Sequence, residues 1–105
     1  MDRLSDGPFV CGINAKNDYF RFYKSGTLAS SDIQGVGADF GHAVVIVGRY
    51  KDEWIIQNSW GTSWGDDGFI RLAVEEGDGV LNLNKYCAYM TVVWSLMMID
   101  SVSPI

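Results

Sequence analysis

The sequence has few of the residues that build metal centres, nucleic-acid surfaces or membrane spans. Its 105 residues include one histidine, two cysteines and two prolines, and 13 acidic residues outnumber 8 basic ones. One histidine and two separated cysteines form no ligand cluster, so neither a metal nor another cofactor is expected. Lysine and arginine do not cluster, which argues against nucleic acid as a partner.

No stretch resembles a membrane span or a secretion signal. The most apolar stretch, Tyr86 to Ile99, is too short and too often interrupted by polar residues to cross a bilayer. Residues Met1 to Asp6 lack the apolar segment of a signal peptide. No membrane partner is therefore expected, and the net charge of −5 is interpreted as a solvated surface.

The sequence does contain short apolar and alternating runs, separated by glycine-rich and acidic loops. A chain of 105 residues corresponds to one domain, and 48% apolar residues are enough to form its core. The alternation predicts mainly antiparallel strands in a small barrel or sandwich. Residues 17–24 fit either a helical turn or a strand, and residues 25–41 are expected to form a loop. The expected strands are Phe9–Asn14, Ala43–Tyr50, Glu53–Asn58, Gly68–Val74 and Tyr86–Trp94.

A histidine and an asparagine stand at the ends of two predicted strands. His42 directly precedes one of them, and Asn58 ends the next. Adjacent strands would bring the two side chains together, and the asparagine carbonyl would then accept a proton from one imidazole nitrogen and fix the tautomer. The other nitrogen would be free to serve a nucleophile. The alternatives are a core histidine and a turn asparagine.

Several motifs in order resemble the papain-like cysteine peptidases over about residues 7–92. They are Gly-Pro at residues 7–8, Phe-Arg-Phe-Tyr-Lys-Ser-Gly at 20–26, the histidine strand, Asn-Ser-Trp-Gly at 58–61 and Trp-Gly-Asp-Asp-Gly-Phe-Ile-Arg at 64–71. The resemblance implies an α+β papain-like fold, of which residues 1–105 would form a single partial domain, the C-terminal or "right" half. The N-terminal half with the nucleophile would be absent from this chain.

The resemblance also implies roles for individual residues. His42 would be the general base, and Asn58 would orient it. Trp60 would cover the bond between them, or simply pack in the core, and Trp64 would line the groove for the leaving side of the substrate. Small walls in the pocket for the side chain two residues before the cleaved bond would favour an apolar side chain. The matching wall positions are Gly12, Ala43 and Val92.

Neither cysteine fits the nucleophile of that family. Cys11 stands inside a predicted strand, and papain-type cysteines precede their histidine by about a hundred residues or more. The oxyanion-hole glutamine has no counterpart either, because Gln34 and Gln57 lie outside its motif. In the family, a cysteine matching Cys87 bridges to one shortly before the histidine, where this chain has none. Cys87 is therefore expected to be a buried thiol.

These observations lead to three hypotheses. In the first, the chain is the His/Asn half of a papain-like cysteine peptidase that hydrolyses peptide or protein substrates, with the cysteine on a missing N-terminal half or companion chain. The chain alone would then be inactive, and Trp60 and Trp64 would be the centre of an apolar face for that half. In the second, it is a non-catalytic fragment or a peptide- or partner-binding module that kept the barrel but not the chemistry. The third, an unrelated β domain, leaves the motifs unexplained. Resemblance alone implies a lysosomal or secreted location.

Overall fold

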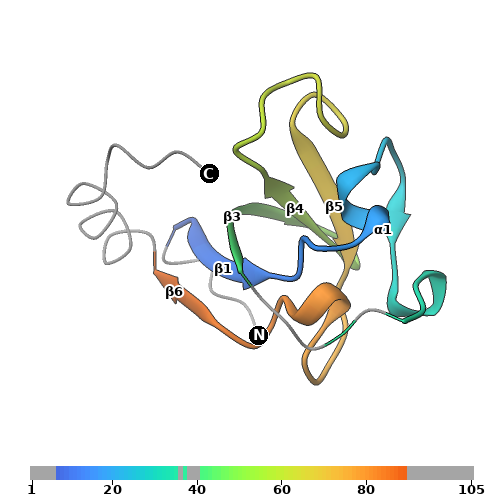
Figure 1. Cartoon of the computed structure of the whole chain (residues 1–105). Helices are drawn as coiled ribbons and strands as arrows, with labels where there is room; N and C mark the ends of the chain where they lie inside the picture. Colours follow the sequence, from blue (N-terminus) through green and yellow to red (C-terminus); the bar gives the residue numbers. More distant parts are fainter. Residues whose placement is uncertain (1–6, 36, 38–40, 90–105) are drawn as a thin grey trace.

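Six β-strands form one sheet in which all neighbours but one pair run antiparallel (Figure 1). The computed structural model describes residues 7–35, 37 and 41–89. Across the sheet the order is β2-β5-β4-β3-β1-β6, and β2–β5 is the parallel pair. The strands are β1 (Phe9–Ile13), β2 (Thr27–Leu28), β3 (His42–Tyr50), β4 (Glu53–Gln57), β5 (Phe69–Ala73) and β6 (Cys87–Tyr89).

The sheet is open, which corrects the expectation of a barrel or sandwich. Its edges are β2 and β6, and no pairing joins these two strands within the described residues. A closed barrel needs each strand to be paired on both sides. Edge strands of two and three residues offer few backbone groups for such closure.

The strand positions follow the predicted alternation closely. Four of the five expected strands are present, each with one or both ends shifted by a single residue. The fifth, expected over Tyr86–Trp94, begins at Cys87, and residues 90–94 lie outside the described part of the chain. The strand β2 falls in the segment expected to be a loop, because two residues are too short to produce an alternating pattern.

In the core, one face of the central strands packs against residues of two helical segments, α1 (Asp18–Arg21) and η3 (Val80–Asn82). Alternate residues of β3, β4 and β5 are buried, as the period of a half-buried strand requires. Beyond the end of β1, the Asn14 N–H donates to the carbonyl of Leu81, which fixes η3 beside the sheet. The largest fully buried side chains are Phe20, Ile13, Ile46, Ile56, Ile70, Leu72, Val44, Val80 and Cys11.

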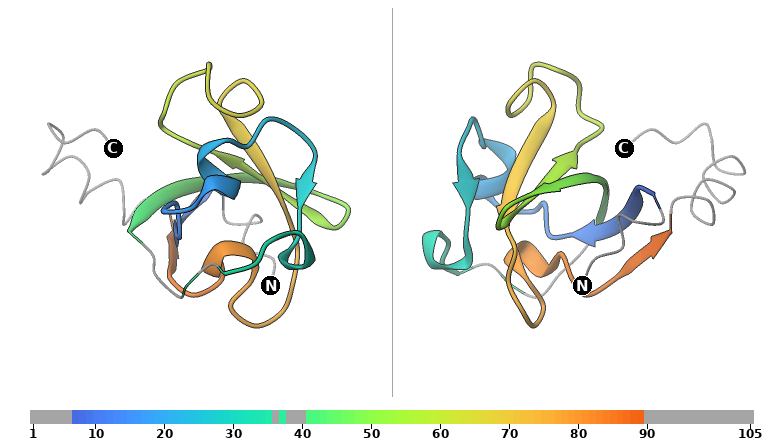
Figure 2. Two further views of the ribbon diagram at one scale, coloured as in Figure 1. Left: turned by 45° about the vertical axis from the view of Figure 1, so that its right-hand side comes forward. Right: turned by 180° about the vertical axis from the view of Figure 1, so that it is seen from behind.

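Helical structure in the described residues is confined to single turns, which Figure 2 shows beside the sheet. None of these helices has the length and apolar character needed to cross a membrane. Asn17 caps α1 by accepting from the Phe20 N–H at 2.9 Å, and its own amide donates to the Asn14 carbonyl at 2.8 Å. These two hydrogen bonds of Asn17 fix the start of α1, from which Phe20 points into the core and is 0% exposed. The turns are α1 (Asp18–Arg21), η2 (Ser30–Asp32) and η3 (Val80–Asn82).

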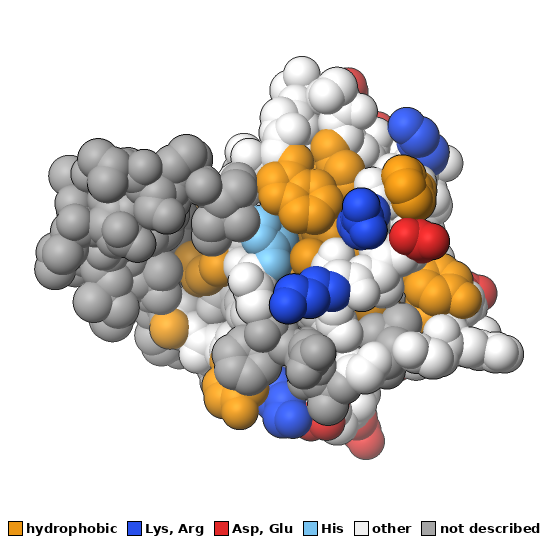
Figure 3. All heavy atoms as spheres, viewed as in Figure 1, with side chains coloured by type: hydrophobic (Ala, Val, Ile, Leu, Met, Phe, Trp, Pro, Cys, Tyr) orange, Lys and Arg blue, Asp and Glu red, His pale blue; other side chains and the backbone are white. Residues whose placement is uncertain are grey.

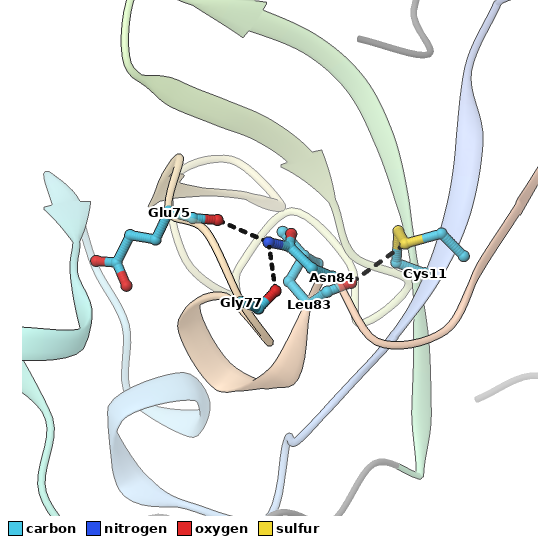
Figure 4. The surroundings of a disulfide bond; sticks show 6 residues. Cys11, Glu75, Gly77, Leu83 and Asn84 are labelled. Atoms are coloured by element: carbon cyan, nitrogen blue, oxygen red, sulfur yellow. Dashed lines mark hydrogen bonds between the residues drawn. A yellow bond between two sulfur atoms is a disulfide. The ribbon is translucent and has the colours of Figure 1, made fainter. Parts of the chain in front are cut away.

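A disulfide joins Cys11 in β1 to Cys87 in β6, which corrects the prediction that Cys87 is a free buried thiol. The two residues are direct partners in the antiparallel β1–β6 pair, with Cα atoms 4.1 Å apart. Two cysteines allow one disulfide, but the prediction gave weight to the absence of the family's usual partner just before the histidine. The pairing of a distant strand brings Cys11 into that role. Figure 4 shows the bond beside Leu83, whose carbonyl oxygen lies 3.2 Å from the Cys87 sulfur.

The loop before β6 is held by one asparagine. The side-chain amide of Asn84 donates to the carbonyls of Glu75 at 2.7 Å and Gly77 at 3.2 Å (Figure 4). Gly79 lies against the same side chain with a φ of 76°, and a Cβ there would come within 2.8 Å of the Asn84 Cγ. The close packing explains why this position is glycine, and it fixes the course of the chain toward the disulfide.

Candidate active site

His42 and Asn58 meet at one end of the neighbouring strands β3 and β4. His42 is the first residue of β3 and pairs with Ile13 of β1, while Asn58 directly follows β4. The His42 Nε2 and Asn58 Oδ1 atoms are 2.6 Å apart, and each residue is 7% exposed. The Asn58 N–H donates to the Gly68 carbonyl at 3.0 Å, so the returning loop holds the asparagine in place.

The hydrogen bonds of Asn58 determine which imidazole nitrogen carries the proton. The Oδ1 atom accepts from the Ser59 N–H at 2.8 Å, which identifies it as the carbonyl oxygen. The nearby His42 Nε2 must therefore be the protonated nitrogen and donate to Oδ1. In the neutral ring, Nδ1 then carries a lone pair and can accept a proton. The Asn58 Nδ2 is buried without a hydrogen-bond partner in the described part of the chain. Rotating the amide would bury the oxygen there instead and place the NH₂ against the Ser59 N–H, which is itself a donor.

Aromatic rings enclose the histidine. The Trp60 ring centroid lies 5.0 Å from that of His42 with an interplanar angle of 35°, and Phe20 approaches His42 edge-on at 5.8 Å. Phe20 also contacts Trp60 at 5.1 Å and Trp64 at 4.9 Å. Because apolar rings exclude water, they strengthen the polar bond that they enclose.

Trp64 belongs to the core of this cluster, whereas it was expected to line the substrate groove. It is 9% exposed, and its indole N–H lies 3.2 Å from the Phe20 carbonyl and 3.1 Å from that of Arg21. The following residue, Gly65, has a φ of 62°, and a Cβ there would meet the Phe69 carbonyl oxygen at 2.7 Å. This tight turn draws Trp64 inward under Phe20 and leaves the partly exposed Trp60 as the indole at the surface.

An open hollow lies beside the histidine. Its volume is about 410 Å³, and Figure 3 shows the pale-blue histidine at the surface between hydrophobic and basic side chains. Sequence reasoning did not identify the two basic residues of its wall, since isolated charges on a polar segment carry no pattern. The wall consists of Asn14, Ala15, Lys16, Arg21, Gly41, His42 and Trp60.

The predicted pocket residues Gly12 and Ala43 face each other across β1 and β3. They are direct partners in the register, one position along from the Ile13–His42 pair. Gly12 is half-buried and Ala43 is exposed. Val92, the third predicted wall residue, lies outside the described residues. Gly12 and Ala43 therefore adjoin His42 on the side away from Asn14 and the hollow.

Sequence reasoning assigned Phe20 no role of its own, although its ring contacts three members of the site. Two features of the sequence could have indicated this role: Phe20 opens the motif at residues 20–26, and a capping asparagine stands three positions before it. Within the described residues no group of three His, Cys, Asp or Glu side chains could hold a metal ion. The arrangement can accept and release a proton at His42 beside an open surface.

Comparison with known proteins matches these features to one family. The profile described as "Papain family cysteine protease" matches residues 1–91. Cathepsin S of Mus musculus is 37% identical over 87 residues, which cover 79% of this chain and 24% of that protein. Macrodontain-1 of Ananas macrodontes is 37% identical over 73 residues, covering 69% of this chain and 32% of that protein. The chain thus spans about a quarter to a third of the length of these curated relatives.

Two solved structures confirm the predicted fold class. A cysteine protease of Carica candamarcensis in complex with E-64 superposes with a TM-score of 0.71 and 32% identity, covering 81% of this chain and 39% of that one. The bromelain protease of Ananas comosus, also in complex with E64, gives a TM-score of 0.68 and 30% identity, covering 82% and 41%.

Proposed function

Because this chain belongs to the papain family of cysteine proteases, a family of hydrolases, we propose that it supplies the histidine and asparagine of a peptidase active site. The observation that carries this proposal is the bond between His42 Nε2 and Asn58 Oδ1. Since Oδ1 also accepts from Ser59, the proton is on Nε2, and Nδ1 is left as the base. His42 lines the open hollow, where a thiol and a peptide can reach it.

In the proposed reaction, His42 takes a proton from a cysteine thiol and later gives it to the leaving amine. Asn58 keeps the imidazole in the required tautomer and orientation without adding a charge. Trp60 covers the histidine at 5.0 Å and limits the access of water to the bond. Gly12 and Ala43, as direct partners next to His42, provide small walls for the substrate side chain before the cleaved bond.

The reacting thiol comes from residues outside this sequence. Cys11 and Cys87, the two cysteines of the chain, are joined in a disulfide and leave no free thiol. Cys11 is also 1% exposed, on the inner face of β1. A companion segment with the cysteine and the oxyanion hole would then complete the site against the face of Trp60, and the isolated chain would be inactive.

The disulfide also supports a location for the protein. Disulfides persist in oxidising compartments and are rare in reducing ones. We therefore place the working enzyme in the lysosome or outside the cell, in agreement with the location that family resemblance implies.

The test uses the recombinant 105-residue chain and the polypeptide that carries it in its source, recovered with an antibody to the chain. The recombinant chain is expected to cleave no fluorogenic peptide and to form no adduct with an epoxysuccinyl thiol reagent. Loss of the nucleophile in another catalytic triad lowers turnover about a millionfold. The recovered polypeptide, alone or with its bound partner, is expected to cleave the peptide and to take up the reagent on a cysteine outside these 105 residues.

Two outcomes would contradict the proposal. Turnover by the recombinant chain that disappears with Cys11→Ser would assign the nucleophile to Cys11. A recovered polypeptide that binds peptide but takes up no reagent would support the non-catalytic binding module instead. In an active polypeptide, Asn58→Ala is expected to lower turnover and to leave peptide binding unchanged, since Asn58 acts by positioning His42.

A further inference from the structure

The hollow beside His42 carries a charge opposite to that of the chain as a whole. Its wall contains the basic residues Lys16 and Arg21 and no carboxylate among the described residues, although the chain has a net charge of −5. Both basic residues are exposed, and neither has an ion-pair partner within the described part of the chain. A concave surface with charges of one sign concentrates ligands of the other sign.

The register of β1 and β3 places this hollow relative to the direction of a bound peptide. Ile13 pairs with His42, and the next pair toward the middle of β1 is Gly12 with Ala43. On the other side of the Ile13–His42 pair β1 ends, and the chain continues through Asn14, Ala15 and Lys16, which line the hollow. If Gly12 and Ala43 hold the residues before the cleaved bond, as the proposed function requires, the hollow receives the residues after it.

We propose that this hollow selects substrates with a carboxylate on the leaving side of the cleaved bond, through Lys16 and Arg21. This inference rests on the proposed function for the direction of the peptide. The carboxylate belongs either to an acidic side chain or to a free C-terminus close to the bond. Trp60 forms the apolar wall beside it, so the subsite combines one indole with two cations. A neutral residue in this place would not be attracted by the two cations, and a basic residue would be repelled by them.

The experiment measures binding of leaving-side peptides to the recombinant chain by NMR. His42 is the single histidine, so one set of imidazole signals reports on the hollow. The first pair of probes is Glu-Ala-amide against Gln-Ala-amide, which differ only in the side-chain charge. The second pair is Ala-Ala against Ala-Ala-amide, which differ only at the C-terminus. If the acid of the first pair binds more tightly, the hollow recognises an acidic side chain. If the acid of the second pair binds more tightly, it recognises a free C-terminus.

The acid of at least one pair is expected to bind about three- to tenfold more tightly than its neutral partner, the range for one or two partly exposed ion pairs. The preference should fall to about one in the double variant Lys16→Gln/Arg21→Gln, and it should weaken as salt increases. Lys24→Gln is the matched control, because Lys24 is exposed and does not line the hollow. This variant should keep the full preference.

Three results would overturn the proposal. These are equal affinity within both pairs, a preference that survives the double variant, or binding that leaves the His42 signals unchanged. Each of them would leave the proposed function untouched, because labelling of a cysteine by the epoxysuccinyl reagent does not depend on charge in this hollow. Conversely, absence of labelling together with a charge preference at His42 would contradict the peptidase and identify a site that binds acidic peptides.

Discussion

The middle of β1 and its C-terminal end are held by different kinds of interaction. At Cys11 the strand is linked covalently to β6, through a disulfide between direct neighbours in the sheet. At Ile13 it pairs with His42 of β3, and just beyond its end the Asn14 N–H donates to the Leu81 carbonyl. The Phe20 ring in turn packs against His42. The disulfide involves no group of the proposed chemistry, whereas the C-terminal end of β1 lies beside His42.

The difference separates what stabilises the fold from what shapes the site. The cross-link acts on the whole chain by restricting its unfolded state, so its loss should lower stability with little effect on local geometry. The contacts around Phe20 act locally, since they position His42 and Trp60 directly. Variants at the disulfide should therefore change mainly the stability of the whole chain, and variants around Phe20 should also change the geometry of the site.

The largest effect is expected from removing the disulfide. The cysteines are 76 residues apart in sequence, and a cross-link that closes a loop of this length contributes about 4 kcal/mol to the free energy of unfolding. Cys11→Ala/Cys87→Ala should lose about that amount in urea denaturation, while the NMR signals of His42 and Trp60 stay near their original positions.

The single variants test the interpretation of that loss. Cys11→Ala and Cys87→Ala each abolish the same cross-link, so each should lose nearly as much as the double variant. A set of fully additive losses would show that side-chain packing, and not the cross-link, stabilises the contact between β1 and β6. Large shifts of the His42 signals would contradict the separation between the cross-link and the site.

A smaller loss of stability, with a larger local effect, is expected at Phe20. Phe20→Ala removes a ring that is 0% exposed, at a cost of about 3 kcal/mol. Because this ring contacts His42, Trp60 and Trp64, the signals of all three should move. Phe22→Ala is the matched control in the same segment, since Phe22 is 66% exposed and should cost less than about 0.5 kcal/mol. Unchanged His42 signals in Phe20→Ala would refute the positioning role of the ring.

The smallest effect is expected at Tyr23, at the margin of the aromatic cluster. Burial raises the pKa of its phenol above the ordinary value of 10.0, although Arg71 partly opposes this. The folded state thus favours the protonated phenol, and this contribution to stability is present below about pH 10 and lost as the pH rises through the raised pKa. Tyr23→Phe should flatten the alkaline fall of the unfolding free energy.

The same variant should cost about 1 kcal/mol at neutral pH, because the Tyr23 hydroxyl donates to the Gly26 carbonyl. Tyr50→Phe provides the control for this loss, since Tyr50 is 58% exposed and removal of its hydroxyl should cost less than about 0.5 kcal/mol. An alkaline fall in Tyr23→Phe equal to that of the original chain would contradict the effect of burial.

The alternating strands and the His42–Asn58 contact could be predicted from sequence because their signals are local. Alternation marks each strand, and a short hairpin makes β3 and β4 neighbours, so residues at their adjoining ends must approach each other. The papain-like motifs supplied the fold class, since their order along the chain is specific. These predictions needed no knowledge of how distant segments pair.

The features that sequence reasoning missed depend on distant pairing. The disulfide requires β6 to lie next to β1, and β2 exists only because it meets β5 in parallel. Trp64 is buried because the turn at Gly65 carries it beneath Phe20, whereas Trp60, four residues earlier, stays at the surface. Both tryptophans precede a glycine and carry the same local signal, so that signal does not predict which of them is buried.

The disulfide has a further consequence for the proposed function, in which the nucleophile is a reduced sulfur. Thiol–disulfide exchange requires an attacking thiolate to reach a sulfur of the bond. Cys11 is 1% exposed inside the sheet, and the Cys87 sulfur lies against the Leu83 carbonyl in a half-buried position. A mild reductant that restores an exposed, oxidised nucleophile would therefore act on this buried bond far more slowly. Under the proposed function, burial of the disulfide would let the protein keep this bond oxidised in a solution that keeps the nucleophile reduced.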